Sequence, residues 1–449
     1  MPTEVLGEAR LLNLGSGAWH GDRSLAVLLP SQWSVKVHWP ATPPEITDDE
    51  IRRCLDQPVG QPPLRRLVTG CTRPVVVVDD LTRPTPLERL MPFVLAEFEA
   101  AGIPPEQVTL VMATGTHGPP GSSRAMERKA GQLAATRCRV LVHDHLGDVV
   151  RLGRTSYGTP VLVNRDVAES DYVVGIGGVY PQHTTWFGGG TKLVLGVLGE
   201  RSIAHLHYRH WGLLGSYALE NDFRRDLGEV AAMAGLRTSM SVHIDAYRRP
   251  VRVSAGDPES FYPGAARYSR ETYSVPTPGD ADVVIANAYP MDLSLTFATS
   301  KGTVPLKHAK PGASRVLLAA CPEGDGHHGL FPLLRVPPNY YRIQRLRRHL
   351  VARRQLASRV AWRLTQAAAG RIRAGRAGPT AAEAGPTRPI HLYRPAADGA
   401  PPIDARGAGV VATSTWEEIL ARVSAEQGDG PLRAVVYPCA PLQRLAFDG

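Results

Sequence analysis

The stretch PVVVVDD at residues 74–80 carries the clearest indication of the fold. It is an unbroken run of apolar, mostly β-branched residues, and such runs form strands that are buried on both faces of a parallel sheet. The following segment, LTRPTPLERLMPFVLAEFEAAG at residues 81–102, has the pattern of a helix, with Thr85 as a candidate N-cap and Pro86 at its first position. Together the two segments predict one strand–helix unit of an α/β protein.

The same order of a short apolar run, a polar or glycine-containing loop and a helical pattern recurs along the chain. Further runs of this kind begin at residues 108, 170, 280, 314 and 409. Strands that alternate with helices indicate parallel sheets. We therefore expect two α/β domains with mainly parallel sheets, the first over residues 1–275 and the second over residues 276–449, with the active site in the cleft between them.

Length and composition agree with this expectation. The chain has 449 residues and is 43% hydrophobic, which is typical of a globular protein with more than one domain. Its five cysteines are odd in number and far apart, so the sequence contains neither a disulfide framework nor a CxxC metal motif. Because no apolar run is long enough to span a membrane and the start lacks the pattern of a signal peptide, we expect a cytoplasmic protein.

The net charge of +9 comes from one region of the sequence. Eleven arginines and no acidic residue lie at residues 342–376, inside a segment at about residues 340–389 that combines a basic helical pattern with a Gly/Pro/Ala-rich linker. Such a segment either binds nucleic acid or an anionic membrane, or is a solvated insertion. We expect an insertion, and no nucleic-acid partner, because Trp362 is the only aromatic residue available there for base stacking.

Polar residues stand directly after several predicted strands, where ligands bind in open α/β sheets. Asp80 and Arg83 follow the first strand, and the planar guanidinium of Arg83 is suited to hold a carboxylate. His117 follows the second strand in ATGTHGP, and Lys301 begins a later helical pattern. Each has a plainer interpretation: a strand end and helix cap for Asp80 and Arg83, a surface loop for His117, and a solvated cap for Lys301.

The segment YPQHTTWFGGGTKLVLGVLGERSIAHLHYRH at residues 180–210 is the richest in candidate site residues. Gly188, Gly189 and Gly190 allow backbone amides to approach a phosphate. Lys192 adds either a positive charge or a nucleophile for a covalent link. The order Gly-Thr-Lys is not that of a P-loop, so nucleotide binding of that kind is not predicted.

Histidines are dense in and around this segment. His183 precedes the glycines, while His205 and His207 would point apart on a helix, so we expect at most one of them to bind a metal. The plainer alternative is an interfacial helix with polar contacts. The sequence HDH at residues 143–145 is expected to form a surface or turn structure, and HH at residues 327–328 to line a site at best.

Taken in order, these motifs resemble a known family. The series Asp-Asp-x-Thr-Arg-Pro, Gly-Thr-His, His…Gly-Gly-x-Lys, His-x-His and Ser-Lys-Gly is similar to that of the nickel-pincer-dependent lactate racemases and related 2-hydroxyacid racemases and epimerases. The resemblance covers most of the chain, from LPSQWSVKVHWP to CPEGDG. It implies a cytoplasmic isomerase that inverts a 2-hydroxy acid by reversible hydride transfer, with a small-molecule substrate and separate cofactor maturation enzymes as its partners.

The resemblance also implies a cofactor and its ligands. The cofactor would be nickel held in pyridinium-3,5-bisthiocarboxylic acid mononucleotide, the nickel pincer, covalently attached to Lys192. Gly188, Gly189 and Gly190 would give this group room, and His207 would complete the coordination of nickel. Sulfur ligands together with one imidazole suit Ni(II) in a square-planar geometry.

Substrate and acid–base roles follow from the same resemblance. His117 and His183 would act as acid and base on the two faces of the substrate, as stereoinversion requires, and imidazole titrates near cellular pH. Arg83 and Lys301 would hold the carboxylate of the substrate, and Asp80 would position Arg83.

Some positions depart from the pattern of the family. Ala298 stands where the family usually has glutamine, Pro-Gln-His replaces Pro-His before the glycines, and Gly-Thr-His-Gly-Pro replaces Gly-Thr-His-Arg-Pro. These positions surround the expected substrate, so the sequence leaves open which 2-hydroxy acid is bound. Two other functions fit the same residues: a zinc-dependent hydrolase that uses the histidines, and a non-catalytic relative that binds an anion or a nucleotide.

Overall fold

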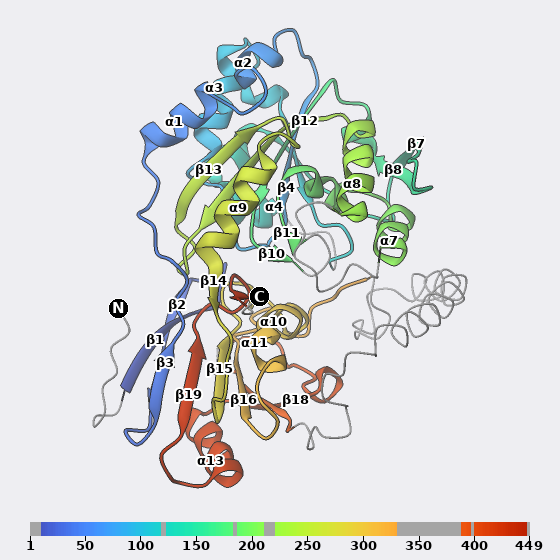
Figure 1. The fold of residues 1–449 in the computed structure, drawn as a ribbon. Helices are drawn as coiled ribbons and strands as arrows, with labels where there is room; N and C mark the ends of the chain where they lie inside the picture. The colour runs from blue at the N-terminus through green and yellow to red at the C-terminus, as the bar shows by residue number, and fades with distance from the viewer. Residues whose placement is uncertain are drawn as a thin grey trace, which may run out of the picture.

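The computed structural model describes residues 10–117, 123–182, 186–210, 221–329, 388–396 and 399–446. The predicted acid–base residue His183 and the arginine-rich stretch at residues 342–376 lie outside these ranges. The described chain forms two α/β halves, each built on a six-stranded sheet, which lie one above the other in Figure 1. Within the described ranges, no helix has the length and apolar character needed to cross a membrane.

The first sheet is parallel except for one antiparallel edge strand, β13. In spatial order its strands are β13 (Pro250–Gly256), β12 (Leu236–Ile244), β9 (Tyr172–Gly178), β4 (Pro74–Asp79), β5 (Thr109–Ala113) and β6 (Arg139–Val142). Every residue of β4, β5 and β9 is buried, as their unbroken apolar sequences predict. The predicted α/β class with mainly parallel strands is therefore confirmed.

Helices cover both faces of this sheet because alternate residues of each strand point to opposite sides. Val76 and Val78 of β4 face one hydrophobic core, and Val75 and Val77 face the other. The first core is covered by α1 (Asp48–Asp56), α2 (Leu64–Leu67), α3 (Met91–Ala100), α4 (Ser123–Ala130) and α5 (Gln132–Arg137). The second core is covered by the 3₁₀ helix η2 (Gly190–Val197), α7 (Glu200–Arg209), α8 (Asp222–Met233), α6 (Arg165–Ala168) and the hairpin of β7 (Val149–Arg154) and β8 (Pro160–Asn164). This half also contains η1 (Pro105–Gln107), the short pair β10 (Pro181–Gln182) and β11 (Trp186–Phe187), and α9 (Tyr262–Tyr273).

All neighbouring strands of the second sheet run parallel. In spatial order they are β18 (Val410–Thr413), β17 (Ile390–Tyr393), β16 (Ser314–Leu318), β15 (Val283–Asn287), β19 (Arg433–Tyr437) and β3 (Ser34–Val37). One face packs against α10 (Leu295–Gly302), α11 (Val304–Lys307) and the short η4 (Arg406–Ala408). The other face packs against α13 (Trp416–Gln427) and the hairpin of β1 (Arg10–Ser16) and β2 (Arg23–Leu29).

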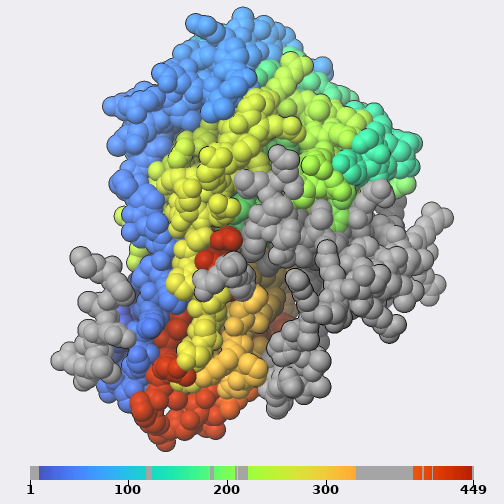
Figure 2. Space-filling model, in the orientation of Figure 1, coloured from blue at the N-terminus to red at the C-terminus, as the bar shows by residue number. Residues whose placement is uncertain are grey.

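The N-terminal strands belong to the second sheet, although they precede the first sheet in the sequence. Strand β3 pairs in parallel with β19, and near the other end of the chain β20 (Arg444–Ala446) pairs with β14 (Ser274–Pro276). In Figure 2 the blue N-terminal residues accordingly lie beside the red C-terminal ones. The predicted division between residues 275 and 276 thus does not separate the two sheets, because β3 pairs with an edge of β19 that would otherwise expose unpaired backbone groups.

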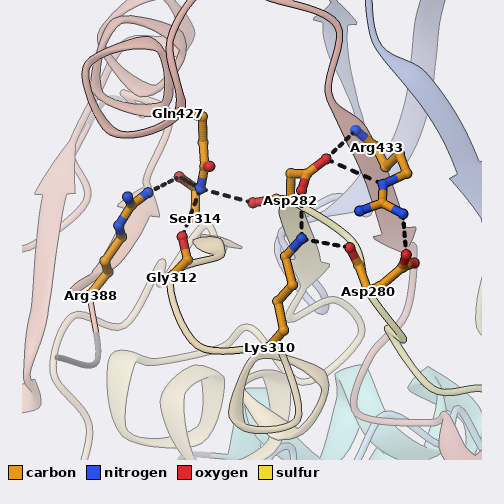
Figure 3. Close-up of polar contacts among 8 residues, drawn as sticks. All are labelled: Asp280, Asp282, Lys310, Gly312, Ser314, Arg388, Gln427 and Arg433. Carbon is orange, nitrogen blue, oxygen red and sulfur yellow. Dashed lines mark hydrogen bonds and ion pairs between the residues drawn. The ribbon is translucent and has the colours of Figure 1, made fainter. Parts of the chain in front are cut away.

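A polar network ties together the loops at the amino ends of the second sheet (Figure 3). Asp282, just before β15, accepts hydrogen bonds from Lys310 Nζ (2.6 Å) and from the backbone nitrogen of Arg433 (2.9 Å). Burial alone would raise the pKa of Asp282, but these donors outweigh burial and lower its pKa to about 2. Gln427 of α13 donates to Ser314 Oγ (3.1 Å) at the start of β16. The network therefore fixes one end of this sheet, opposite to the strand ends that carry polar site residues.

The helix after β4 begins later than the sequence predicts. It starts at Met91 and not near Thr85, and residues 81–90 contain no helical turn of α3. The buried amine of Lys129 donates to the carbonyl oxygens of Arg83 (3.0 Å) and Thr85 (2.9 Å). The predicted N-cap at Thr85 is therefore wrong, since a tertiary contact and not a helix satisfies these carbonyls.

Two buried histidines should make stability depend on pH. Burial lowers the pKa of His143 to about 4 and that of His243 to about 4. The unfolded chain binds a proton at each near its ordinary pKa of 6.5, while the folded protein does so only near pH 4. The free energy of unfolding should thus be at its full value above about pH 6.5 and fall toward pH 4 by about 1 kcal/mol per pH unit for each histidine.

Urea unfolding at about pH 7 and about pH 5 measures this dependence. The variant His243→Gln, which does not titrate, should show a smaller pH slope than the wild type. An unchanged slope would contradict the assignment of this stability term to His243.

Candidate functional site

A cavity of about 430 Å³ is lined by residues from both halves of the protein. The first half contributes residues that follow the carboxyl ends of β4, β5 and β9 and residues of η2 and α7, and the second half contributes α10, α11 and the loop after β16. Carboxyl ends of parallel strands are the usual ligand position in α/β proteins. The sequence-predicted residues that line the cavity are Asp80, Arg83, His117, Gly188, Gly189, Lys192, His207 and Lys301.

Asp80 and His117 form a buried hydrogen-bonded pair. The Nδ1 atom of His117 lies 3.0 Å from Asp80 Oδ2, and because a carboxylate only accepts, Nδ1 is the donor. Burial lowers the pKa of His117 more than the Asp80 charge raises it. For Asp80, burial favours a raised pKa, but His117 and Arg83 outweigh it and the pKa is lowered. At neutral pH the pair is thus a carboxylate and a neutral imidazole whose Nε2 can accept a proton.

Asp80 acts on Arg83 through a third residue. The Asp80 carboxylate accepts a hydrogen bond from Thr82 Oγ1 (2.6 Å), and this oxygen accepts one from the Arg83 guanidinium (3.2 Å). The sequence suggests that Asp80 positions Arg83, whereas in the structure its carboxylate directly holds His117 and Thr82. Thr82 is a site residue that the sequence analysis missed, although it stands inside the motif that contains both partners.

Lys192 lies half-buried on the 3₁₀ helix η2, with its amine in the lining of the cavity. Burial lowers its pKa to about 7, and repulsion by Arg83 and Arg224 adds to the shift. A large share of the amine is therefore uncharged at neutral pH, and an uncharged amine is a nucleophile. This environment suits a covalent attachment point better than a permanent cation.

The three glycines before Lys192 are required by close backbone packing. A Cβ atom on Gly188 would lie 2.6 Å from the carbonyl oxygen of Gly178, and one on Gly189 would lie 2.4 Å from Val179. Gly189 and Gly190 also have positive φ angles of 80° and 59°. Gly188 and Gly189 therefore present backbone atoms to the cavity, and Gly190 lies just beyond its lining.

His207 presents one ring nitrogen to the cavity in a defined tautomer. Its Nδ1 lies 2.8 Å from the carbonyl oxygen of Ile203 one helical turn earlier. A carbonyl only accepts, so Nδ1 carries the hydrogen and Nε2 keeps its lone pair. Burial lowers the pKa of His207 to about 4, which keeps the ring neutral. A neutral imidazole whose other nitrogen donates to a backbone carbonyl is the form that binds metal ions.

His205 of α7 and His210, which directly follows this helix, do not line the cavity. His205 lies 2.9 Å from Thr159 Oγ1, and His210 Nε2 lies 2.8 Å from Asp226 Oδ2. The prediction that a helix would turn His205 and His207 apart is confirmed. The contacts of His205 and His210 attach α7 and its C-terminal end to α8 and to the residue before β8, and so fix the helix that carries His207.

Lys301 enters the cavity from α10 of the second half. Its Nζ donates to Gln182 Oε1 (3.2 Å), a contact between residues 119 positions apart in the sequence. Burial lowers the pKa of Lys301 well below its ordinary value, and the charges of Arg83 and Lys192 lower it further. The structure thus places Arg83 and Lys301 in the lining of the same cavity. Two groups that hold one carboxylate must lie together in this way.

His328, from the HH motif that was expected to line a site at best, does line the cavity, and Phe297 is a further lining residue that the sequence did not single out. The ring of His117 lies 4.9 Å from that of His328 and 5.1 Å from that of Phe297, both in edge-to-face contact. The backbone nitrogen of Gly329 donates to the carbonyl oxygen of Thr116 (2.7 Å), so the loop after β16 docks on the loop of His117. In the sequence, the sign that His328 lines the site was the position of HHG, residues 327–329, after a predicted strand.

The remaining histidine motif does not form a metal site. His143 and His145 are both buried, His145 in a turn, and His143 Nε2 lies 3.0 Å from the carbonyl oxygen of Leu198. In the described ranges, no three or more His, Cys, Asp or Glu side chains are grouped so as to hold a metal ion.

Comparison with known proteins identifies relatives of this chain. Residues 20–213 match the family model described as the lactate racemase N-terminal domain, a range that contains Arg83, His117, Lys192 and His207. The chain is 25% identical over 293 residues to lactate racemase of Lactiplantibacillus plantarum, which covers 63% of this chain and 68% of the relative. It is 27% identical over 295 residues to lactate racemase of Thermoanaerobacterium thermosaccharolyticum, with the same two shares covered.

Solved structures agree on the fold. The lactate racemase apoprotein from Thermoanaerobacterium thermosaccharolyticum matches with a TM-score of 0.68 at 20% identity and covers 97% of this chain and 100% of that structure. A structural-genomics protein from Thermotoga maritima matches with a TM-score of 0.59 at 16% identity over 90% of this chain and 100% of that structure.

Two mainly parallel sheets covered by helices, with a shared cavity that holds a histidine–carboxylate pair, are the fold and site of an α/β enzyme. The matches above show that this chain is similar to lactate racemases, and the enzyme is an isomerase.

Proposed function

We propose that the protein is a racemase or epimerase of a 2-hydroxy acid that works by reversible hydride transfer. The observation that supports this most directly is that one cavity is lined by a neutral histidine held by a carboxylate, an amine with a pKa of about 7, and a histidine in the tautomer of a metal ligand. Arg83 and Lys301 add the positive charges that a carboxylate substrate requires.

The residues present fit a covalently attached nickel pincer, pyridinium-3,5-bisthiocarboxylic acid mononucleotide with nickel. Lys192 would form the link through its amine, and His207 would bind nickel through Nε2, which remains available because Nδ1 donates to Ile203. Gly188 and Gly189 would lie against the cofactor with backbone atoms. When bound, the cofactor supplies the site that accepts and returns a hydride.

Arg83 and Lys301 would bind the substrate carboxylate from two sides. Arg83 is fixed through Thr82 and Asp80, and Lys301 is fixed through Gln182, so the carboxylate would be oriented by groups with defined positions. Holding this end of the substrate leaves its hydroxyl-bearing carbon free to react from either face.

The Nε2 atom of His117 would accept the proton of the substrate hydroxyl while a hydride leaves the carbon that bears this hydroxyl. The lowered pKa keeps its ring neutral before the step, and Asp80 stabilises the imidazolium that forms. The planar 2-oxo acid can then receive hydride on either face. We propose His183, which lies outside the described residues, as the acid–base group for the opposite face.

The proposal extends to partners and compartment. A small 2-hydroxy acid is the substrate, and maturation enzymes that build the cofactor act on the protein in the cytoplasm. A non-catalytic anion-binding relative is the weaker alternative, because it would not need the Asp80–His117 pair or the His207 tautomer.

The fate of the hydrogen on the hydroxyl-bearing carbon tests the mechanism. Protein produced together with cofactor maturation enzymes should contain nickel and should convert one enantiomer of a 2-hydroxy acid into the racemate. In D₂O that carbon should keep its original hydrogen, because hydride does not exchange with solvent. Deuterium incorporation at this carbon would show proton abstraction and contradict hydride transfer, and absence of inversion with every 2-hydroxy acid would contradict the racemase proposal itself.

A further inference from the structure

The cavity contains more basic side chains than one carboxylate requires. Its lining contains four basic side chains, those of Arg83, Lys192, Lys301 and Lys307. In the described lining the only carboxylates are Asp79 and Asp80, and both are already engaged. Asp79 Oδ1 lies 2.7 Å from the buried Lys129 amine, and Asp80 binds His117 and Thr82.

Neighbouring basic side chains add to the effect of burial on the pKa values of groups in the cavity. Burial, Arg83, Lys192 and Lys307 all lower the pKa of Lys301. Burial likewise lowers the pKa of His328 well below its ordinary value, and His117, His207, Arg83 and Lys301 lower it further. An anionic ligand would relieve this repulsion, and each added negative charge would relieve more of it.

After the proposed roles are assigned, two hydrogen-bond donors remain on the wall near Lys301. Lys307 ends α11, and among the residues that the structure describes its amine has no hydrogen-bond or ion-pair partner. Gln182 is 6% exposed, its Oε1 accepts from Lys301, and its Nε2 has no partner within the described ranges. An unsatisfied buried amide costs about 1–3 kcal/mol, so a ligand that accepts a hydrogen bond there gains affinity.

We propose that the substrate is a 2-hydroxy acid with a second carboxylate, and that Lys307 and Gln182 Nε2 bind that second group. This inference rests on the proposed function, since it assigns Arg83 and Lys301 to the first carboxylate. The second carboxylate lies toward the mouth of the cavity, where Lys307 is exposed. The methyl group of lactate leaves both donors without an acceptor.

Two ligands of equal size separate charge from shape. Malate has two carboxylates, and its mono-amide at carbon 4, 2-hydroxysuccinamate, replaces the second carboxylate with a neutral group. Isothermal titration of the full-length chain should show malate binding about tenfold or more tightly than the mono-amide, a difference of about 1.4 kcal/mol in binding free energy. The nickel-loaded protein should show the same preference in kcat/KM for inversion.

Lys307→Met removes the charge with little change in size. It should lower the affinity for malate about tenfold and leave that for 2-hydroxysuccinamate within about twofold. The control Lys36→Met removes an exposed charge from β3 in the same half and should change neither affinity. Nickel content should be equal in all three proteins, because Lys307 is not assigned to the cofactor.

Equal affinity of the wild type for the two ligands would overturn the inference. An equal loss of affinity for malate and for 2-hydroxysuccinamate in Lys307→Met would also overturn it. A loss of nickel in Lys307→Met would also overturn it, because Lys307 would then serve the cofactor. Inversion of lactate at the rate of malate would overturn the dicarboxylate assignment but leave the racemase proposal intact. Failure of the racemase proposal differs from all of these, since no 2-hydroxy acid of any charge would be inverted.

Discussion

Replacing Lys192 with alanine should abolish attachment of the cofactor and lower racemisation by about 10³-fold or more, because the reaction then lacks its hydride acceptor. We propose the amine of Lys192 as the nucleophile for attachment, since burial and the neighbouring arginines bring its pKa to about 7. Intact-mass measurement of matured protein should show the added mass in the wild type and not in the variant. Peptide mapping should place it on the peptide that contains Lys192.

Lys301→Met is the matched control for this experiment. Lys301 lines the same cavity and also has a lowered pKa, but we assign it to the substrate carboxylate. This variant should keep the added mass and raise KM. Finding the added mass on Lys301, or on any lysine other than Lys192, would refute the assignment.

Replacing His117 with alanine should lower kcat/KM for inversion by about 10²-fold or more, the usual cost of losing a general acid–base group. The variant should keep the cofactor mass and nickel, because His117 is assigned neither to the cofactor nor to nickel. Its contacts are with Asp80, Thr82, Phe297 and His328. We expect a loss of similar size for His183→Ala, since each histidine is proposed to serve one face of the substrate.

Asp80→Asn provides a graded comparison. The amide can still contact His117 but removes the negative charge that stabilises the imidazolium. Its kcat/KM should fall between those of the wild type and His117→Ala. Wild-type rates in both His117→Ala and His183→Ala would show that the two-base mechanism is wrong.

Much of the fold was predictable because short runs of apolar residues in the sequence indicate which strands are buried. Strands β4, β5 and β9 are continuous apolar segments and are buried throughout, as expected for strands covered on both faces. The helix boundary after β4 was not predictable, because the loop of Arg83 and Thr85 is held by the amine of Lys129, which lies in a different helix.

Part of the candidate site was predictable for a similar reason. Lys192, His207 and the glycines lie within one continuous segment, and parallel strands bring their carboxyl ends to one edge of a sheet. The sequence therefore indicated which side chains could share a site. It did not indicate that Asp80 would bind His117 directly, because the choice among partners within hydrogen-bond reach depends on side-chain geometry.

By itself, the sequence determined the α/β class, the buried strands and the ordered set of polar residues at strand ends. Only the tertiary structure decided that β3 joins the second sheet, that Lys301 meets Gln182 and that His328 packs against His117. These contacts join segments far apart in the chain, and no local pattern encodes them. They depend on how two separately patterned sheets pack, because a side chain meets a distant partner only after the hydrophobic cores have fixed the positions of both backbones.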